Sequence, residues 1–166
     1  TKIHPTSIYG ITKQMQEDMC MVVGKSLGIP VVAYRDQNVY GPGQSLKNPY
    51  TGILSIFSTI IKNNNSINIF EDGKESRDFV YIDDIVEATV LGIEKDEAKF
   101  ESFNVGTGVC TNVIEVANTL KSKYESNTEI SISGNYRLGD IRHNYADLTK
   151  INDKLGFVPS IDFETG

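Results

Sequence analysis

Helical and strand patterns alternate along this chain of 166 residues. Residues 8–27 place apolar side chains at helical spacing between a predicted N-cap, Ser7, and a terminating glycine, Gly28. The run Pro-Val-Val-Ala-Tyr at 30–34 then predicts a buried strand. Alternation of this kind is typical of α/β folds, in which helices cover a largely parallel sheet.

The alternation continues to the end of the chain. Helices are predicted over 51–62, 82–93, the segment capped by Thr111, and 148–155, and strands over 67–70, 78–81, 102–105 and 129–133. Ligands of α/β sheets bind outside the carboxyl ends of the strands, so the exits after Tyr34 and Val105 are expected to border a site.

Composition excludes several classes of function. A net charge of −6 argues against a nucleic-acid surface. Two histidines and two cysteines, Cys20 and Cys110, form no metal-binding spacing, so no metal is predicted. No apolar run reaches the roughly 20 residues that span a bilayer, and the first residues do not resemble a signal peptide. Unclustered cysteines suit a reducing compartment, so we expect a cytoplasmic protein that contacts neither membrane nor nucleic acid.

Tyr9 and Lys13 carry the most chemically informative pattern. Four residues apart, they share one face of the predicted N-terminal helix. An ammonium beside a phenol stabilises the phenolate, so Tyr9 could accept a proton from a sugar hydroxyl while a hydride leaves the same carbon. The spacing by itself also fits an exposed, solvated pair.

Four motifs together resemble the extended short-chain dehydrogenase/reductase family, in its NAD-dependent nucleotide-sugar epimerase/dehydratase branch, of which UDP-glucose 4-epimerase is typical. The first two are Tyr9-x-x-x-Lys13 and the segment Arg35–Gly43, which contains Asn38. The other two are the segment Arg77–Asp84, and Phe103–Gly106 followed by Arg137-x-Gly139-Asp140. The segment 41–52 also resembles bacterial 4-epimerases that act on UDP- or dTDP-sugars.

The resemblance implies roles for individual residues around NAD. Tyr9 would be the catalytic base, and Lys13 would bind the nicotinamide ribose and favour the phenolate of Tyr9. Tyr34 is expected to pack near the nicotinamide. Arg35 could approach the cofactor or could be a structural ion-pair partner.

The same resemblance assigns the nucleotide-diphosphate sugar to Asn38, Arg77, Arg137 and Asp140. Permanently charged guanidinium groups suit a dianionic diphosphate. The alternatives are a turn-forming asparagine at Asn38, an ion pair of Arg77 with a neighbouring carboxylate, and a solvated loop charge at Arg137. Asp140 could accept from a ribose hydroxyl or orient Arg137.

The glycine-rich dinucleotide motif of this family belongs upstream of the catalytic tyrosine and is not in this chain. Gly106-Thr107-Gly108 lacks the third glycine and is interpreted as a turn. We therefore expect the C-terminal part of an extended short-chain dehydrogenase/reductase fold without its dinucleotide-binding half. Residues 1–45 would end the NAD-binding domain, and residues 46–166 would form mainly the substrate-binding lobe, with interleaved sheet segments.

The predicted function is epimerisation at C4 of a UDP- or dTDP-hexose through a transient 4-keto sugar, with this piece inactive alone. The alternatives are a nucleotide-sugar 4,6-dehydratase and a non-catalytic nucleotide-binding module. A homodimer is expected for the full-length protein, with Met15, Met19 and Val22 either in a helix contact or in the core. Methionines 15, 19 and 21 are interpreted as core residues, and Asp83 and Asp84 as carboxylates that favour a helix start.

Overall fold

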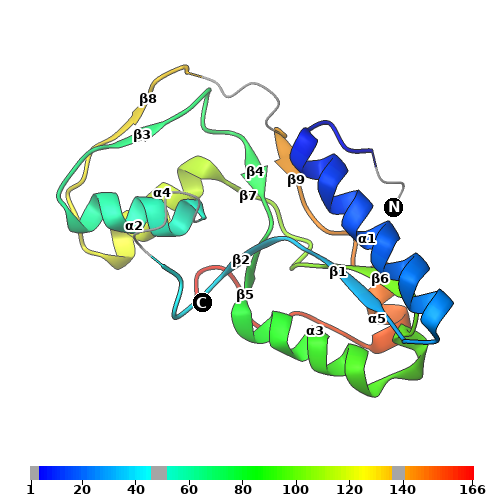
Figure 1. Ribbon diagram of the computed structural model, residues 1–166. Helices are drawn as coiled ribbons and strands as arrows, with labels where there is room; N and C mark the ends of the chain where they lie inside the picture. Colours follow the sequence, from blue (N-terminus) through cyan, green and yellow to red (C-terminus); the bar gives the residue numbers. More distant parts are fainter. Residues whose placement is uncertain (1–3, 46–51, 136–140) are drawn as a thin grey trace.

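The computed structural model describes residues 4–45, 52–135 and 141–166 (Figure 1). The helices are α1 (Ile8–Leu27), α2 (Ile53–Lys62), α3 (Ile82–Glu94), α4 (Val113–Lys123) and α5 (Thr149–Leu155), with a short 3-10 helix at Asp96–Ala98. The strands are β1 (Val32–Asp36), β2 (Asn38–Tyr40), β3 (Ile67–Ile69), β4 (Ser76–Arg77), β5 (Phe79–Tyr81), β6 (Glu101–Val105), β7 (Thr111–Asn112), β8 (Ile130–Ile132) and β9 (His143–Asn144).

Most strands pair in parallel with a partner far away in sequence. Strand β1 pairs with β6, from Val32 opposite Glu101 to Asp36 opposite Val105. Strands β2 and β5 form a second parallel pair, and β3 and β8 a third. Strand β4 lies between β7, which is antiparallel to it, and β9, which is parallel. Parallel pairing requires crossover connections, and helices supply them here, so the α/β prediction is confirmed.

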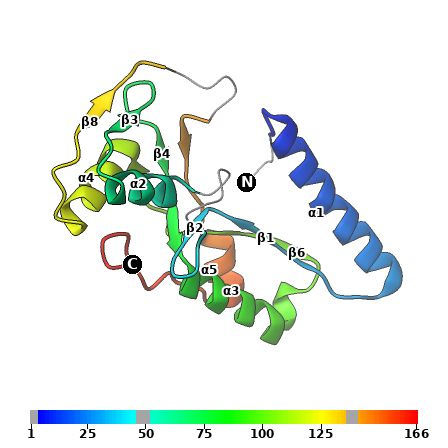
Figure 2. The same cartoon turned by 60° about the vertical axis from the view of Figure 1, so that its left-hand side comes forward.

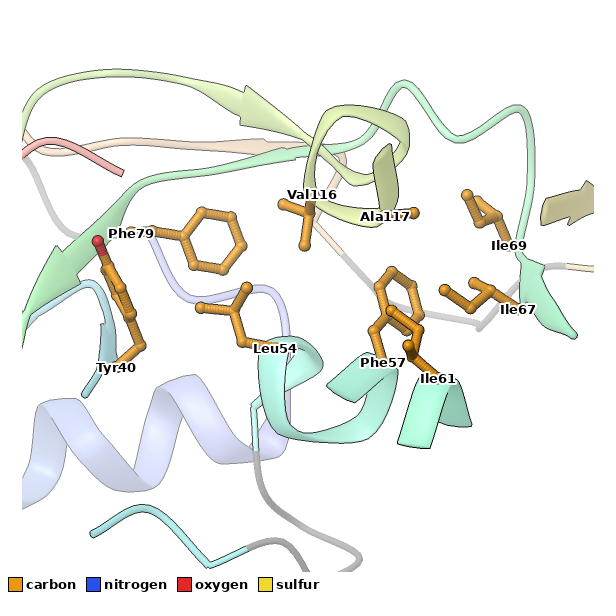
Figure 3. Packing of buried hydrophobic residues seen from close by; sticks show 9 residues of the cluster. All are labelled: Tyr40, Leu54, Phe57, Ile61, Ile67, Ile69, Phe79, Val116 and Ala117. Atoms are coloured by element: carbon orange, nitrogen blue, oxygen red, sulfur yellow. The ribbon is translucent and has the colours of Figure 1, made fainter. Parts of the chain in front are cut away.

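Two hydrophobic clusters divide the core. The first lies between α2, α4 and the strands β3 and β5, and Figure 3 shows its side chains interdigitating. Its buried members are Tyr40, Leu54, Phe57, Ile61, Ile67, Ile69, Phe79, Val116 and Ala117. Tyr40 closes one end of this cluster, where its ring meets Phe79 edge-on at 6.5 Å and Phe163 at 5.8 Å between centroids. Burial raises the pKa of Tyr40 to about 12, so it stays a neutral phenol.

The second cluster joins the β1–β6 pair to α3 and α5. Its buried members are Ala88, Ala98, Phe103, Val105, Ile151, Leu155 and Phe157. Phe103 from β6 is fully buried, and Val32 and Tyr34 of β1 pack against the cluster. Whether a domain boundary falls near residue 45 stays a prediction.

Helix α1 differs from the other helices because its apolar side chains are not covered. Met15, Met19 and Val22 are 55%, 62% and 64% exposed, so the prediction of core positions is wrong for Met15 and Met19, whereas Met21 is half-buried. Within α1, only Gly24 is buried. A Cβ there would lie 2.8 Å from the carbonyl oxygen of Ile29, so the glycine permits the close approach of β1 to the helix. Figure 2 shows α1 standing along one side of the molecule.

Two local predictions also need correction. Residues 38–40 lie outside the strands predicted from the sequence but form β2, because their backbone groups pair with β5. Helix α4 is capped by Asn112 and not by Thr111: the Asn112 side chain accepts from the N–H of Glu115, whose carboxylate accepts from the N–H of Asn112. Among the described residues, no helix is long and apolar enough to cross a membrane.

Candidate active site

Tyr9 and Lys13 lie at the N-terminal end of α1. Ser7 caps this end by accepting a hydrogen bond of 3.1 Å from the N–H of Gly10. The Lys13 Nζ atom lies 5.7 Å from the centroid of the Tyr9 ring, within the range of a cation–π contact. Tyr9 is 72% exposed, so its phenol is open to a reactant. The helix dipole places a partial positive charge at this end, beside the Lys13 ammonium.

Arg35 is an ion-pair partner of α1 in this structure. Its Nε and Nη2 atoms donate to the two carboxylate oxygens of Glu17 at 2.8 and 2.6 Å. The hydroxyl of Ser102, on β6, donates to the same carboxylate at 2.7 Å. This geometry supports the interpretation of Arg35 as a structural ion-pair partner.

Tyr34 points to the other face of the β1–β6 pair. Its hydroxyl donates to the carbonyl oxygen of Ala88 in α3 at 2.9 Å. A Cβ at Gly92 would collide with this hydroxyl, and desolvation raises the pKa of Tyr34. The phenol thus holds α3 against β1, while the cofactor contact predicted for Tyr34 stays a prediction.

Asn38 and Arg77 are brought close by the pairing of β2 with β5. The N–H of Asn38 donates to the carbonyl oxygen of Asp78, the residue after Arg77, at 2.9 Å. The Nη1 atom of Arg77 donates to the carbonyl oxygens of Ser76 and Arg142 at 2.9 and 3.2 Å. These bonds orient the guanidinium toward the chain that enters β9. In Figures 1 and 2, β4 and β9 lie at the same end of the molecule as the N-terminal end of α1.

Arg137 and Asp140, the other predicted diphosphate residues, lie outside the described residues. Arg142, just beyond them, pairs with Glu71 and Asp72 at 2.9 and 2.6 Å. This double ion pair fixes the start of β9, on the C-terminal side of the predicted loop.

Asp78, a neighbouring carboxylate that the sequence offered only as an ion-pair partner of Arg77, is fully buried. Its Oδ1 atom accepts from the N–H and hydroxyl of Thr107, and its Oδ2 atom accepts from the N–H groups of Gly108 and Ala146. The turn predicted at 106–108 therefore wraps a carboxylate of the protein itself. A small loop rich in glycine and threonine beside a buried strand was the signal in the sequence.

Asp84 also has a role beyond the helix start. Both Asp83 and Asp84 lie in the first turn of α3, as expected. Asp84 is buried, and its carboxylate accepts from the N–H and hydroxyl of Ser160 and from the N–H of Ile161. It thereby ties the C-terminal segment to α3.

Gln37 was also missed. Its side-chain oxygen is buried and has no hydrogen-bond partner among the described residues. Such orphaned acceptors are uncommon in folded proteins. Because Gln37 directly precedes Asn38, the orphaned oxygen marks this connection between β1 and β2 as a place where a further group can donate.

Two cavities lie near these elements without enclosing the predicted residues. A polar cavity of about 290 Å³ lies beside α1 and β6 and includes Arg35, Ser102 and Lys150 in its lining. A more apolar one of about 480 Å³ lies between the loop 41–44, α2, α4 and the C-terminal residues. Neither of the two is lined by Tyr9, Lys13, Asn38 or Arg77, so the chemistry of these residues, and not cavity size, points to the site.

Comparison with known proteins relates the whole chain to one group of enzymes. Residues 1–106 match the NAD dependent epimerase/dehydratase family. The chain is 37% identical over all its 166 residues to a dTDP-L-rhamnose 4-epimerase from Burkholderia thailandensis, covering 46% of that protein. It is 34% identical over 99% of its length to a putative UDP-glucose 4-epimerase from Methanocaldococcus jannaschii, covering 52% of it.

Solved structures agree with these relatives. A UDP-glucose 4-epimerase from Thermotoga maritima with UDP-glucose superimposes with a TM-score of 0.90 at 36% identity, over 98% of this chain and 52% of that one. A UDP-glucuronic acid 4-epimerase from Bacillus cereus, in complex with UDP-glucuronic acid and NAD, gives a TM-score of 0.86 at 27% identity, over 98% and 51%. The chain thus spans about half the length of the relatives it matches. Its sequence and its fold place it in the NAD-dependent epimerase/dehydratase family.

Proposed function

We propose that this chain supplies the catalytic pair and substrate-binding lobe of an NAD-dependent nucleotide-sugar 4-epimerase. The observation that carries the proposal is the exposed Tyr9 phenol at a helix N-terminus, with the Lys13 ammonium 5.7 Å from its ring. A positive charge and a helix dipole at one phenol suit a base that must lose and regain a proton. Relatives named as 4-epimerases cover the whole of this chain.

In this mechanism, Tyr9 removes the proton from the sugar 4-hydroxyl and later returns it. NAD, when bound, would supply the reversible hydride transfer at C4 that a transient 4-keto sugar requires. Lys13 would place its positive charge beside the Tyr9 phenol and bind the nicotinamide ribose. The stereochemical outcome requires the keto sugar to turn over between the two transfers.

The diphosphate of the substrate would be held by Arg77 and Arg137, with Asn38 bonded to the diphosphate or the sugar and Asp140 to a ribose hydroxyl. Guanidinium groups match phosphate oxygens in charge and in the geometry of their donors. Arg77 already has its guanidinium oriented by two carbonyl oxygens. The titles of two structural neighbours name bound UDP-glucose and UDP-glucuronic acid, which favours the same substrate class here.

The described residues fit only one end of NAD. Tyr9 and Lys13 can meet the nicotinamide ribose, with Tyr34 proposed nearby, but the 106–108 loop donates its N–H groups to Asp78 and cannot cradle a pyrophosphate. We therefore assign the adenosine and pyrophosphate contacts to the part of the relatives' length that this chain does not span. For the full-length protein we propose a homodimer that uses the exposed side of α1, and a cytoplasmic location in keeping with the two unpaired cysteines.

The test uses the full-length enzyme with NAD and UDP-glucose or a dTDP-hexose, with C4 inversion followed by proton NMR. Wild-type enzyme should interconvert the C4 epimers. Tyr9→Phe should abolish turnover and leave the dissociation constant for UDP within about threefold, because the phenol hydroxyl acts only on the reacting carbon. Normal turnover of Tyr9→Phe would refute the assignment of the base.

A 4,6-dehydratase remains the second candidate, because two plant relatives, each 30% identical over this chain's whole length, are named as trifunctional enzymes that include UDP-glucose 4,6-dehydratase activity. Mass spectrometry of the product separates a dehydratase from an epimerase, since a dehydratase product has lost one water, whereas an epimer keeps the mass of the substrate. A module that only binds nucleotide would bind UDP and show neither product.

A further inference from the structure

The Glu17 carboxylate has the most extensive side-chain bonding on α1. It accepts two hydrogen bonds from the Arg35 guanidinium and one from the Ser102 hydroxyl, all between 2.6 and 2.8 Å. The Glu17 side chain is only 14% exposed, although it belongs to a helix whose surface is mostly open. Bidentate, partly buried pairs of this type are among the stronger and more directional ion pairs. We call Glu17, Arg35 and Ser102 the Glu17 clamp.

The clamp lies on the same helical stripe as the catalytic pair. Glu17 is one turn beyond Lys13 and two turns beyond Tyr9, at spacings of four and eight residues. At 1.5 Å per residue, these positions lie about 6 and 12 Å apart along the helix axis. The clamp therefore fixes the rotation of α1 about its axis within two turns of the phenol.

Burial along the rest of α1 is concentrated away from the phenol. Gly24, near the C-terminal end of α1, is the buried residue of the helix, and Ile8 and Tyr9 at the other end are 82% and 72% exposed. Side-chain atoms lie roughly 6 Å from a helix axis, so a rotation of about 10° would move them by about 1 Å. A misplacement of that size can cost up to about 100-fold in rate.

We propose that Glu17, held by Arg35 and Ser102, is a positioning residue that sets where Tyr9 and Lys13 stand relative to the sugar and the nicotinamide ribose. The proposal rests on the proposed function for its kinetic consequence. Arg35, which belongs to the second motif, would then contribute to the same reaction by holding helix α1 in place and not by binding the substrate.

The decisive variant is Glu17→Gln in the full-length enzyme, which keeps the shape of the side chain but gives up the charge and one acceptor. We expect kcat to fall about 10- to 100-fold, with KM for the nucleotide sugar within about twofold, because binding depends on other residues. Rates are normalised to folded enzyme by circular dichroism and by bound NAD.

Asp96→Asn is the matched control, because it removes a carboxylate from an exposed ion pair with Lys99, where Asp96 is 87% exposed. Its kcat and KM should equal those of the wild type. If kcat per folded Glu17→Gln enzyme stays within twofold of wild type, the proposal is overturned. A purely structural role would lower the folded fraction and leave kcat per folded enzyme unchanged.

Ser102→Ala covers the case in which Glu17→Gln does not fold, since it keeps the ion pair and removes one hydrogen bond. It should lower kcat about three- to tenfold with KM within about twofold, and an unchanged kcat per folded enzyme would overturn the proposal. Should wild-type enzyme show no epimerisation, the proposed function fails, and amide exchange then tests the clamp alone. Amides of residues 11–14 should exchange faster in Ser102→Ala than in Asp96→Asn, and equal rates would contradict the clamp.

Discussion

Replacing Asp78 tests whether one buried carboxylate holds the substrate side of the fold together. Four donors converge on it: the N–H and hydroxyl of Thr107 and the N–H groups of Gly108 and Ala146, at 2.6 to 3.1 Å. Asp78 follows Arg77 directly, and its carbonyl oxygen accepts from the N–H of Asn38. Loss of the carboxylate should therefore loosen the 106–108 loop and the strand that presents Arg77.

The magnitude follows from the groups left without partners. Asp78→Ala leaves three backbone N–H groups without a hydrogen-bond acceptor, and an unsatisfied buried donor costs about 1–3 kcal/mol. Because water can enter the space that the side chain leaves, we expect a net loss of about 3–5 kcal/mol, typical of breaking a buried charged network. Asp78→Asn should cost less, about 2–4 kcal/mol, because its amide oxygen can still accept from two of the four donors.

Urea unfolding of the full-length protein, followed by circular dichroism, measures the loss as a lowered midpoint, and amide exchange at Thr107 and Gly108 measures it locally. A loss of about 3 kcal/mol corresponds to roughly 100-fold faster exchange through opening. Asp83→Ala, which removes an exposed carboxylate from the same region, is the control and should cost no more than about 1 kcal/mol. If Asp78→Ala unfolds within 1 kcal/mol of the wild type, the four bonds do not hold this loop.

Three further outcomes are expected. Gly92→Ala should destabilise the protein by about 1–3 kcal/mol, because its Cβ collides with the Tyr34 hydroxyl; adding Tyr34→Phe should recover part of the loss in thermal unfolding, and strict additivity would contradict the contact. The Arg35 guanidinium holds the pKa of Glu17 below its ordinary value of 4.5, so the ionised carboxylate stabilises the fold above pH 4.5 and this stabilisation is lost as the pH falls below it. Glu17→Gln should therefore flatten the dependence of the unfolding free energy on pH in the acid range, and an identical acid dependence would contradict the pairing. The 166-residue chain alone should bind NAD weakly, and a micromolar dissociation constant by calorimetry would contradict the division of the cofactor site.

Local sequence signals located most of the elements correctly. Helix α1 begins after Ser7 and ends before Gly28, as predicted, because an N-cap hydroxyl and a left-handed glycine act within one turn of the helix. Residues 38–40 were not predicted as a strand because their strand exists only through pairing with β5, some forty residues later. Short strands of this kind have no periodicity of their own to reveal them.

The candidate site divides in the same way. The sequence by itself determined the residue types and the spacing of Tyr9 four residues before Lys13, since motif spacing on one helix is a local property. Only the tertiary structure decided that Arg35 binds Glu17 and that Asp78 binds the 106–108 loop. It also left the apolar side of α1 uncovered. Charge pairing and burial depend on which distant segments meet, and the local sequence of one segment does not determine its partner.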